Sequence, residues 1–184
     1  AVRSLRGRAA RQAFRQVAGR CRSGSLINVE PIGWVRSSRA GAIDDDWDAV
    51  TATIGLDAAQ FTPDAVAGLE AFSHIEVVFV FDQVEIADVE SGARHPRGNV
   101  EWPRVGIFAQ RAKMRPNRVG VTVCRLLEVD GLVLRMAGLD AIDGTPVLDI
   151  KPYMREFGAR GEVRQPQWSH ELMAGYWTNP DRRI

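Results

Sequence analysis

One segment of the chain, RVGVTVCRLLEVDGLVLRMAGLDAI at 118–142, constrains the fold more than any other. It contains two β-prone runs joined by Asp130-Gly131. An Asp-Gly pair between two apolar runs is a strong signal for a β-hairpin with a two-residue loop. The centre of the fold is therefore expected to be an antiparallel sheet.

Other β-prone runs support this expectation, at 26–38, 50–56, 73–84 and 105–111. One helix start, Thr62-Pro63-Asp64, lies among them, and the segment 169–177 is expected to form a second short helix that packs back onto the domain. Since strands and helices do not alternate along the chain, the sequence predicts a mainly β fold, a small antiparallel β-barrel with one or two short helices.

The distribution of charge divides the chain in two. Residues 1–25 contain seven arginines and no acid, whereas 26–184 carry 17 basic and 23 acidic residues. We therefore expect an Arg-rich, disordered N-terminal arm at 1–25 and one folded domain at 26–184. Three interpretations of the arm remain open: a mis-assigned start or disordered tail, an arm that contacts RNA phosphates, and a targeting peptide that lacks the usual apolar segment.

Several classes of protein are not indicated. The apolar run at 77–81 is far shorter than the ~20 residues of a membrane helix. Cys21 and Cys124 are far apart, and the three histidines lie on separate segments, so neither a disulfide framework nor a metal site is expected. This cysteine usage fits a reducing cytoplasm.

Three loops concentrate polar side chains: RHPRGN at 94–99, RAKMRPN at 111–117 and DGTP at 143–146. If the loops meet at one end of the sheet, their arginines suit an anionic ligand. Alternatively, the arginines are solvated or pair with acidic residues of the domain. The last loop has the chemistry of a tight turn, with exposed backbone groups that suit a small ligand.

Four motifs, in this order, resemble the TsaA-like (YaeB/TrmO) family: GLEAFSHIEVVFVFDQ, GIFAQR, RPNRVGVT and GLDAIDGTPVLDIKPY. The resemblance runs from about Ile27 to Tyr153. It implies a small cytoplasmic β-barrel, usually a homodimer, that binds S-adenosylmethionine. It also implies the family's characterised activity, N6-methylation of the threonylcarbamoyl-adenosine next to the anticodon of certain tRNAs.

By position, the resemblance implies a cofactor site formed by Asp82, Gln83, Arg111, Leu126, Asp143, Gly144, Thr145 and Pro146. Asp82 departs from the family, which has histidine in the version known best. A second departure is SSRAGAIDDDWDAV, which stands where many relatives have a Pro-Arg-Gln-Pro-Gly loop. Whatever that loop contributes must come from around Asp46 and Trp47, or be absent.

The acceptor side of the site is less defined. Residues that could contact the phosphates or bases of tRNA are Arg94, Arg97, Arg115, Lys151 and Tyr153. No catalytic base is identified, although Asp140 and Tyr153 are candidates. Two alternatives remain: a methyltransferase with a small-molecule acceptor, favoured by the acidic domain and by the absence of the additional C-terminal domain of longer relatives, and a non-catalytic cofactor-binding barrel that interacts with RNA.

Overall fold

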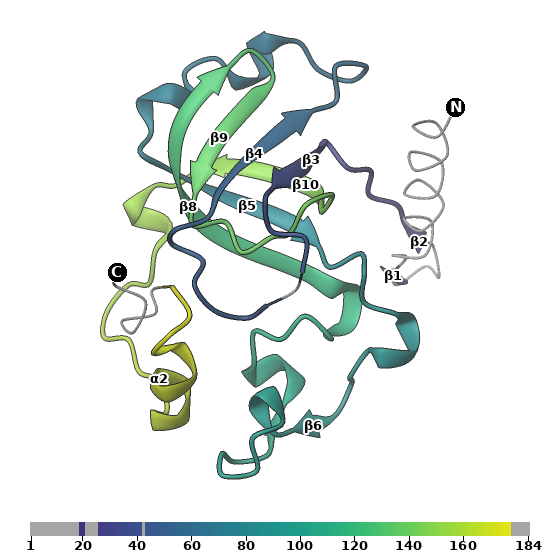
Figure 1. Ribbon diagram of the computed structural model, residues 1–184, viewed down its shortest axis with the longest axis vertical. Helices are drawn as coiled ribbons and strands as arrows, with labels where there is room; N and C mark the ends of the chain where they lie inside the picture. The colour runs from purple at the N-terminus through teal and green to yellow at the C-terminus, as the bar shows by residue number, and fades with distance from the viewer. Residues whose placement is uncertain (1–18, 21–25, 42, 178–184) are drawn as a thin grey trace.

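A closed antiparallel barrel forms the centre of the protein, seen in a computed structural model that describes residues 19–20, 26–41 and 43–177 (Figure 1). Its strands follow each other in the order β10-β3-β4-β9-β8-β5. They are β3 (Gly33–Ser37), β4 (Thr51–Leu56), β5 (His74–Val80), β8 (Val119–Asp130), β9 (Val133–Ala137) and β10 (Pro146–Pro152). The predicted mainly β barrel is confirmed.

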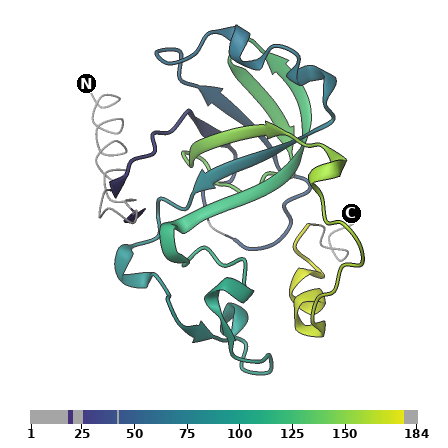
Figure 2. The same cartoon turned by 180° about the vertical axis from the view of Figure 1, so that it is seen from behind.

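Smaller elements lie outside the barrel. Strand β1 (Gly19–Arg20) pairs with β2 (Leu26–Ile27), and β6 (Ala93–Arg94) pairs with β7 (Val105–Gly106). The described α-helix, α2, spans Gln167–Met173. Short 3₁₀ helices occur at Pro63–Val66, Leu69–Ala71, Ile86–Asp88, Pro96–Gly98, Ile107–Ala109, Pro116–Arg118 and Arg155–Phe157. Helix α2 and the β6–β7 segment lie at the same end of the barrel (Figures 1 and 2).

Alternation along the strands fills the barrel. In β5, Ile75, Val77 and Phe79 are almost completely buried, whereas the residues between them are half-buried. The same period of two places one face of every strand inside the barrel. The core so formed consists of Val35, Ala52, Ile54, Val66, Ile75, Val77, Phe79, Cys124, Leu134, Met136, Leu139, Ala141 and Val147.

Strand β8 is the longest strand, and its two halves have different neighbours. Residues 119–125 pair with β5, whereas the register with β9 runs from Arg125 to Asp130. Among the described residues, no strand pairs with 119–124 on the side that β9 occupies further along. We call this stretch the free edge of β8.

The predicted hairpin is confirmed, but its two-residue loop is Gly131-Leu132, one position later than the expected Asp130-Gly131, because Asp130 still pairs with Val133. The expected strand at 105–111 is wrong, because only its first two residues form a strand and a 3₁₀ helix follows. The side-chain amide of Gln110 donates to the carbonyl of Val105 at 2.9 Å, so the chain folds back on itself within this segment.

The expected short helix after Thr62 is also different in type. Two 3₁₀ helices replace it, and Gly68, with a φ of +86°, stands between them. The Thr62 side chain makes no capping hydrogen bond. A left-handed residue ends a helix, so the segment cannot continue as one α-helix.

A close approach across β5 and β8 gives the first testable prediction. A Cβ atom at Gly120 would lie 2.4 Å from the Phe79 ring, which is fixed in the core. We expect Gly120→Ala to lower the free energy of unfolding by about 1–3 kcal/mol, measured by urea denaturation. Gly55→Ala is the matched control, since no atom lies within 4 Å of its added methyl group. Equal urea midpoints for the two variants would contradict this packing.

Candidate functional site

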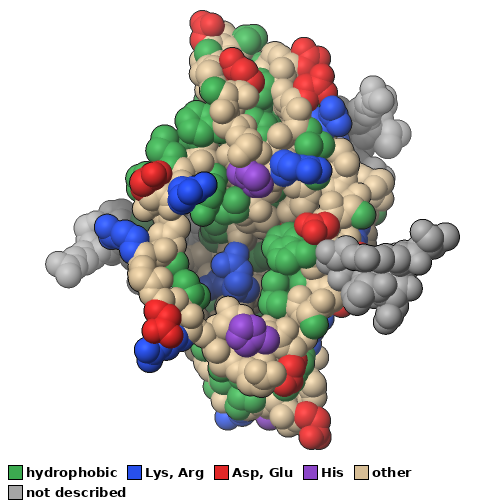
Figure 3. Space-filling model, turned by 90° about the vertical axis from the view of Figure 1, so that its left-hand side faces the viewer, with side chains coloured by type: hydrophobic (Ala, Val, Ile, Leu, Met, Phe, Trp, Pro, Cys, Tyr) green, Lys and Arg blue, Asp and Glu red, His purple; other side chains and the backbone are tan. Residues whose placement is uncertain are grey.

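A cleft of about 1630 Å³ lies along the free edge of β8. Its walls come from the ends of β5 and β8, the β6–β7 segment, residues 140–145 and the C-terminal segment 165–177. Small-molecule pockets usually measure about 300–1,000 Å³, so this cleft has room for more than one bound group. The face of the molecule that carries α2 is visibly hollowed, with a basic side chain inside the hollow and apolar ones beside it (Figure 3).

The lining combines aromatic and cationic side chains. Phe79 and Phe81 meet edge to face with ring centroids 5.3 Å apart, and Trp47 lines another part of the cleft. Cationic side chains in the lining are Arg94, Arg97, Arg111, Lys113 and Arg115. Flat apolar surfaces beside positive charge suit a ligand that carries both an aromatic ring and an anionic group.

Asp140 is the centre of a hydrogen-bonded cluster in this cleft. The Thr122 hydroxyl donates to one carboxylate oxygen, and the Tyr176 hydroxyl donates to the other at 2.5 Å. Burial, and then the neighbouring Asp140 carboxylate, raise the pKa of Tyr176 well above its ordinary value. The phenol therefore stays protonated at neutral pH and holds the carboxylate in place as a donor.

The C-terminal segment that carries Tyr176 is held by backbone hydrogen bonds. The amides of Asp46, Trp47 and Asp48 donate to the carbonyls of residues 175–177, at 3.3, 3.1 and 2.9 Å in chain order. Trp47 is only 4% exposed. The segment around Asp46 and Trp47 thus lies at the cleft, where the sequence departs from the family's proline-rich loop.

Two arginines, Arg97 and Arg39, also hold this acidic loop in place. Arg97 pairs with Asp45 at 2.8 Å, and Arg39 donates to the Asp45 carbonyl at 2.5 Å while its guanidinium lies 4.0 Å from the centre of the Trp47 ring. Part of the positive charge predicted for a ligand is therefore used within the chain.

Two arginines of the cleft are less completely engaged. Arg111 donates to the carbonyl of Val121, on the free edge of β8, at 2.5 Å. Arg94 contacts the Met114 sulfur at 3.2 Å, and its Nε is the only buried side-chain nitrogen or oxygen without a hydrogen-bond partner among the described residues. Because an unpaired buried donor is costly, Arg94 indicates a place for an acceptor on this wall.

The turn at 143–146 has fewer free backbone groups for a ligand than its sequence suggests. Gly144 has a φ of +83°, as a tight turn requires. The three amides of the turn all donate within the chain: Asp143 to Arg39, Gly144 to Val35 and Thr145 to Ile142. The Asp143 carboxylate accepts from the amide of Ser37 at 3.1 Å. The Thr145 carbonyl is also used, since it accepts from the amide of Val35 at 3.0 Å, so the turn has few backbone groups left for a ligand.

The structure brings some of the predicted residues together and not others. Those that line the cleft are Asp82, Gln83, Arg94, Arg97, Arg111, Arg115, Asp140 and Thr145. Those outside its lining are Leu126, Asp143, Gly144, Pro146, Lys151 and Tyr153. Leu126 packs against the core, and the Lys151 amine pairs with Asp149. No role was predicted for Thr122, although it ends the RPNRVGVT motif, and Tyr176 lies outside all four motifs.

The barrel and its cleft define the protein as a closed β-barrel with a large cleft outside the barrel, beside a free strand edge. Residues 44–159 match the family model described as the tRNA-methyltransferase O N-terminal domain, and the chain belongs to this family. The family inferred from the four motifs is thereby confirmed. Tyr176 lies beyond the matched residues. Among the described residues, no helix combines the length and apolarity needed to span a membrane.

Curated relatives and solved structures agree with this family. The tRNA (adenine(37)-N6)-methyltransferase of Escherichia coli K12 is 46% identical over 97 residues, 50% of this chain and 40% of the relative. A probable S-adenosyl-L-methionine-binding protein of Pyrococcus abyssi is 36% identical over 142 residues, 76% of this chain and 74% of the relative. The crystal structure of TrmO from Pseudomonas aeruginosa superposes with a TM-score of 0.62 at 33% identity, covering 76% of this chain and 61% of that one. This chain thus spans less than half the length of the E. coli relative.

Asp82 gives a prediction about stability and pH. Burial raises the pKa of this carboxyl, and backbone hydrogen bonds and Arg118 oppose the rise. The folded state therefore holds the proton more tightly than the unfolded state, and the free energy of unfolding decreases as the pH rises from the unfolded pKa, about 3.9, through the folded one. We expect Asp82→Asn to raise Tm at neutral pH and to have little effect near pH 3, measured by calorimetry across this range.

The control is Asp64→Asn, which changes an exposed carboxyl on the 3₁₀ helix Pro63–Val66 and should leave Tm unchanged. A lower Tm of Asp82→Asn at neutral pH would mean that the ionised carboxylate stabilises the fold.

Proposed function

We propose that this protein is an S-adenosylmethionine-dependent methyltransferase that acts on the N6 amine of an adenine in tRNA. Its specific acceptor is the threonylcarbamoyl-adenosine next to the anticodon. The observation that carries the proposal is the Asp140 carboxylate, fixed by two hydroxyl donors inside a cleft with room for a cofactor and a nucleoside. The names of the E. coli and P. abyssi relatives support the reaction and the cofactor.

The residues of the cleft fit the cofactor. S-adenosylmethionine carries an aromatic base, ribose hydroxyls and a carboxylate, and when bound it supplies an activated methyl group. Phe81, which is half-buried and is backed by the Phe79 ring, provides apolar surface for the base, and Arg111 and the unpaired Nε of Arg94 provide donors for the carboxylate. Asp82 provides a carboxylate that can accept from hydroxyl groups.

The proposed cofactor site also includes Gln83 and Thr145, which line the cleft. Asp143, Gly144 and Pro146 act on it through the turn that positions Thr145, and Leu126, a residue of β8, acts by packing against the core. Arg115 lies where the phosphates of an RNA bound in the cleft would pass, and Arg97 would reach them only by exchanging its ion pair with Asp45. Arg94 is shared with the cofactor, and Lys151 and Tyr153 would meet RNA only outside the cleft.

Asp140 is the proposed contact to the acceptor. The exocyclic amine of adenine is an N–H donor, and each carboxylate oxygen of Asp140 has acceptor capacity beyond the bond from Thr122 or Tyr176. A fixed carboxylate would align the amine for in-line attack on the methyl carbon. As the bond from nitrogen to that carbon forms, the carbon's bond to sulfur breaks with its electron pair left on sulfur, and the carboxylate would take up the proton that the nitrogen loses. Tyr176 and Thr122 act as positioning residues.

Asp140→Asn tests this role. The amide keeps the shape of the side chain but cannot take up a proton, so we expect the single-turnover rate of methyl transfer to drop by about 10²- to 10⁴-fold. Cofactor affinity should change little. Asp149→Asn, on the outer part of β10, is the matched control and should retain the parent rate. A parent-like rate for Asp140→Asn would show that the carboxylate takes no part in the reaction.

Arg111→Ala tests the cofactor site. Loss of a charge-assisted hydrogen bond should weaken the binding of S-adenosylmethionine by about 1.5–3 kcal/mol, or at least 10-fold, measured by titration calorimetry. The control is Arg36→Ala, which removes an exposed arginine of β3 outside the cleft. If both variants bind the cofactor like the parent, the cofactor lies elsewhere.

The experiment for the function as a whole uses purified protein, methyl-labelled cofactor and total tRNA. Digestion of the tRNA should yield a labelled nucleoside that carries the methyl group on N6 of threonylcarbamoyl-adenosine. Label that appears only in small molecules would favour a small-molecule acceptor. Cofactor binding without any transfer would favour a non-catalytic, RNA-interacting barrel.

We further propose that the protein acts in the cytoplasm as a homodimer, and that its barrel domain spans 26–184 after an Arg-rich arm at 1–25. The resemblance of the four motifs supports the dimer, and the charge distribution supports the domain boundary. Most of the arm lies outside the described residues. Light scattering on the full chain measures the oligomeric state.

A further inference from the structure

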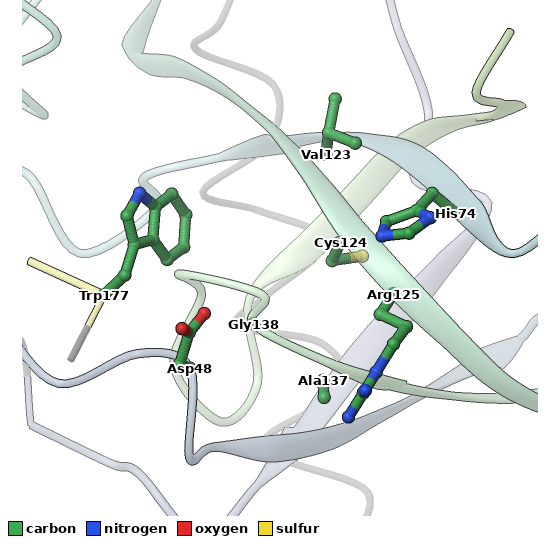
Figure 4. A pocket seen from close by; sticks show the side chains of 8 residues that line it. All are labelled: Asp48, His74, Val123, Cys124, Arg125, Ala137, Gly138 and Trp177. Carbon is green, nitrogen blue, oxygen red and sulfur yellow. The ribbon is translucent and has the colours of Figure 1, made fainter. Parts of the chain in front are cut away.

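A second cavity, of about 490 Å³, lies on the outer wall of the barrel next to the cleft (Figure 4). It is lined by Asp48, His74, Val123, Cys124, Arg125, Ala137, Gly138 and Trp177. Val123 and Trp177 also line the cleft, so the two spaces share a wall at the free edge of β8. We call the smaller space the side pocket. None of the residues inferred from the family resemblance lies in its lining.

One side of the side pocket is cationic. His74 and Arg125 are register partners on β5 and β8, and both point away from the core. On the other side of Arg125, its partner on β9 is the small residue Ala137, which leaves space beside the guanidinium. Arg125 forms no ion pair with any described residue. The His74 Nδ1 lies 2.9 Å from the Ser73 hydroxyl, which orients the ring.

The opposite side of the side pocket is aromatic. Trp177 stands across the pocket from His74 and Arg125 (Figure 4). Its ring packs edge to face on Tyr176 with centroids 5.0 Å apart, and its carbonyl accepts from the amide of Asp48 at 2.9 Å. The indole is therefore held in place. An aromatic surface facing positive charge is the combination that binds a base and a phosphate of single-stranded nucleic acid.

The thiol in the pocket does not indicate covalent chemistry. Burial, with a smaller contribution from Asp140, raises the pKa of Cys124 to about 12. The thiol is therefore protonated at neutral pH and is a poor nucleophile. The side pocket is a binding site, and its volume lies in the usual range of about 300–1,000 Å³ for a single small group.

We propose that the side pocket holds one nucleotide of the RNA acceptor, adjacent in the strand to the adenosine in the cleft, with its base against Trp177 and a phosphate at Arg125 and His74. This inference rests on the proposed function. Both the cleft and the side pocket combine aromatic and cationic side chains, so a ligand that fills both suits them best if it carries a flat ring and a negative charge in each. A nucleic acid strand repeats a flat base and a negatively charged phosphate at each residue.

The test compares Arg125→Gln with Arg36→Gln, a matched change of an exposed strand arginine outside both spaces. The probe is a synthetic anticodon stem-loop RNA that contains threonylcarbamoyl-adenosine, and binding is followed by fluorescence anisotropy at several salt concentrations. We expect Arg125→Gln to weaken RNA binding about 10-fold and to reduce the slope of log K against log salt by about 0.7–0.9, as for one lost phosphate contact. Cofactor affinity and the rate at saturating RNA should remain those of the parent.

A second pair of variants tests the aromatic side. Trp177→Leu should weaken RNA binding about 5-fold or more, whereas Trp177→Phe, which keeps a stacking surface, should recover most of the affinity. Thermal unfolding and cofactor titration of both variants report whether the C-terminal segment remains docked. Recovery by phenylalanine but not by leucine supports stacking. Equal RNA affinity for the leucine and phenylalanine variants overturns it.

The outcomes distinguish a failure of the proposed nucleotide subsite from a failure of the proposed function. If the parent binds and methylates the RNA while Arg125→Gln keeps the parent's affinity and salt slope, the subsite is wrong and the proposed function stands. A loss of cofactor affinity in Arg125→Gln also overturns the subsite, because the pocket would then belong to the cofactor site. If the parent neither binds nor methylates the RNA, the proposed function fails and the subsite fails with it.

Discussion

The unequal pairing of strand β8 is the constraint on which the rest of the structure depends. Strand β9 has five residues and β8 has 12, so β9 cannot pair with β8 along its whole length. It pairs only with the second half of β8. The first half pairs with β5 alone and leaves backbone groups of residues 119–124 at an open edge. Arg111 satisfies one of these groups, the Val121 carbonyl, and the cleft and the side pocket lie on either side of Val123. Strand β8 thereby contributes both to the closed barrel and to an open edge that borders the two cavities.

The acidic loop at 44–46 lies at this edge and binds two of the arginines. Arg97 and Arg39 are held by the loop at 44–46, and their contacts with it and with Trp47 shape the wall of the cleft. Arg111 and Arg94 keep donor capacity on the cleft side. The two sequence-based interpretations of the arginines, internal ion pairing and anion binding, therefore apply to different residues. Which interpretation applies depends on whether the folded chain places a carboxylate or carbonyl beside the guanidinium.

Local patterns predicted much of the barrel, and the family motifs predicted part of the site. The alternation in β5 and the Asp130-Gly131 hairpin are signals within one or two strands, and both were right. The segment at 105–111 was wrong because burial of Ile107 and the back-folding contact of Gln110 arise from tertiary packing. Tyr176 was missed because its contact with Asp140 joins residues 36 apart. The turn at 143–146 was recognised, but the use of its amides by residues 35–39 depends on a pairing across more than 100 positions.

The docking of the C-terminal segment has a consequence for how the protein is made. Ribosomes extend a chain from its N-terminus, and domains begin to fold during synthesis. All six barrel strands exist once Pro152 has been added, whereas Tyr176 and Trp177 follow more than 20 residues later. The barrel can therefore close on a nascent chain while Asp140 still has Thr122 as its only hydroxyl partner within the barrel. The part of the cleft wall that Tyr176 and Trp177 form is thus added after the six strands of the barrel.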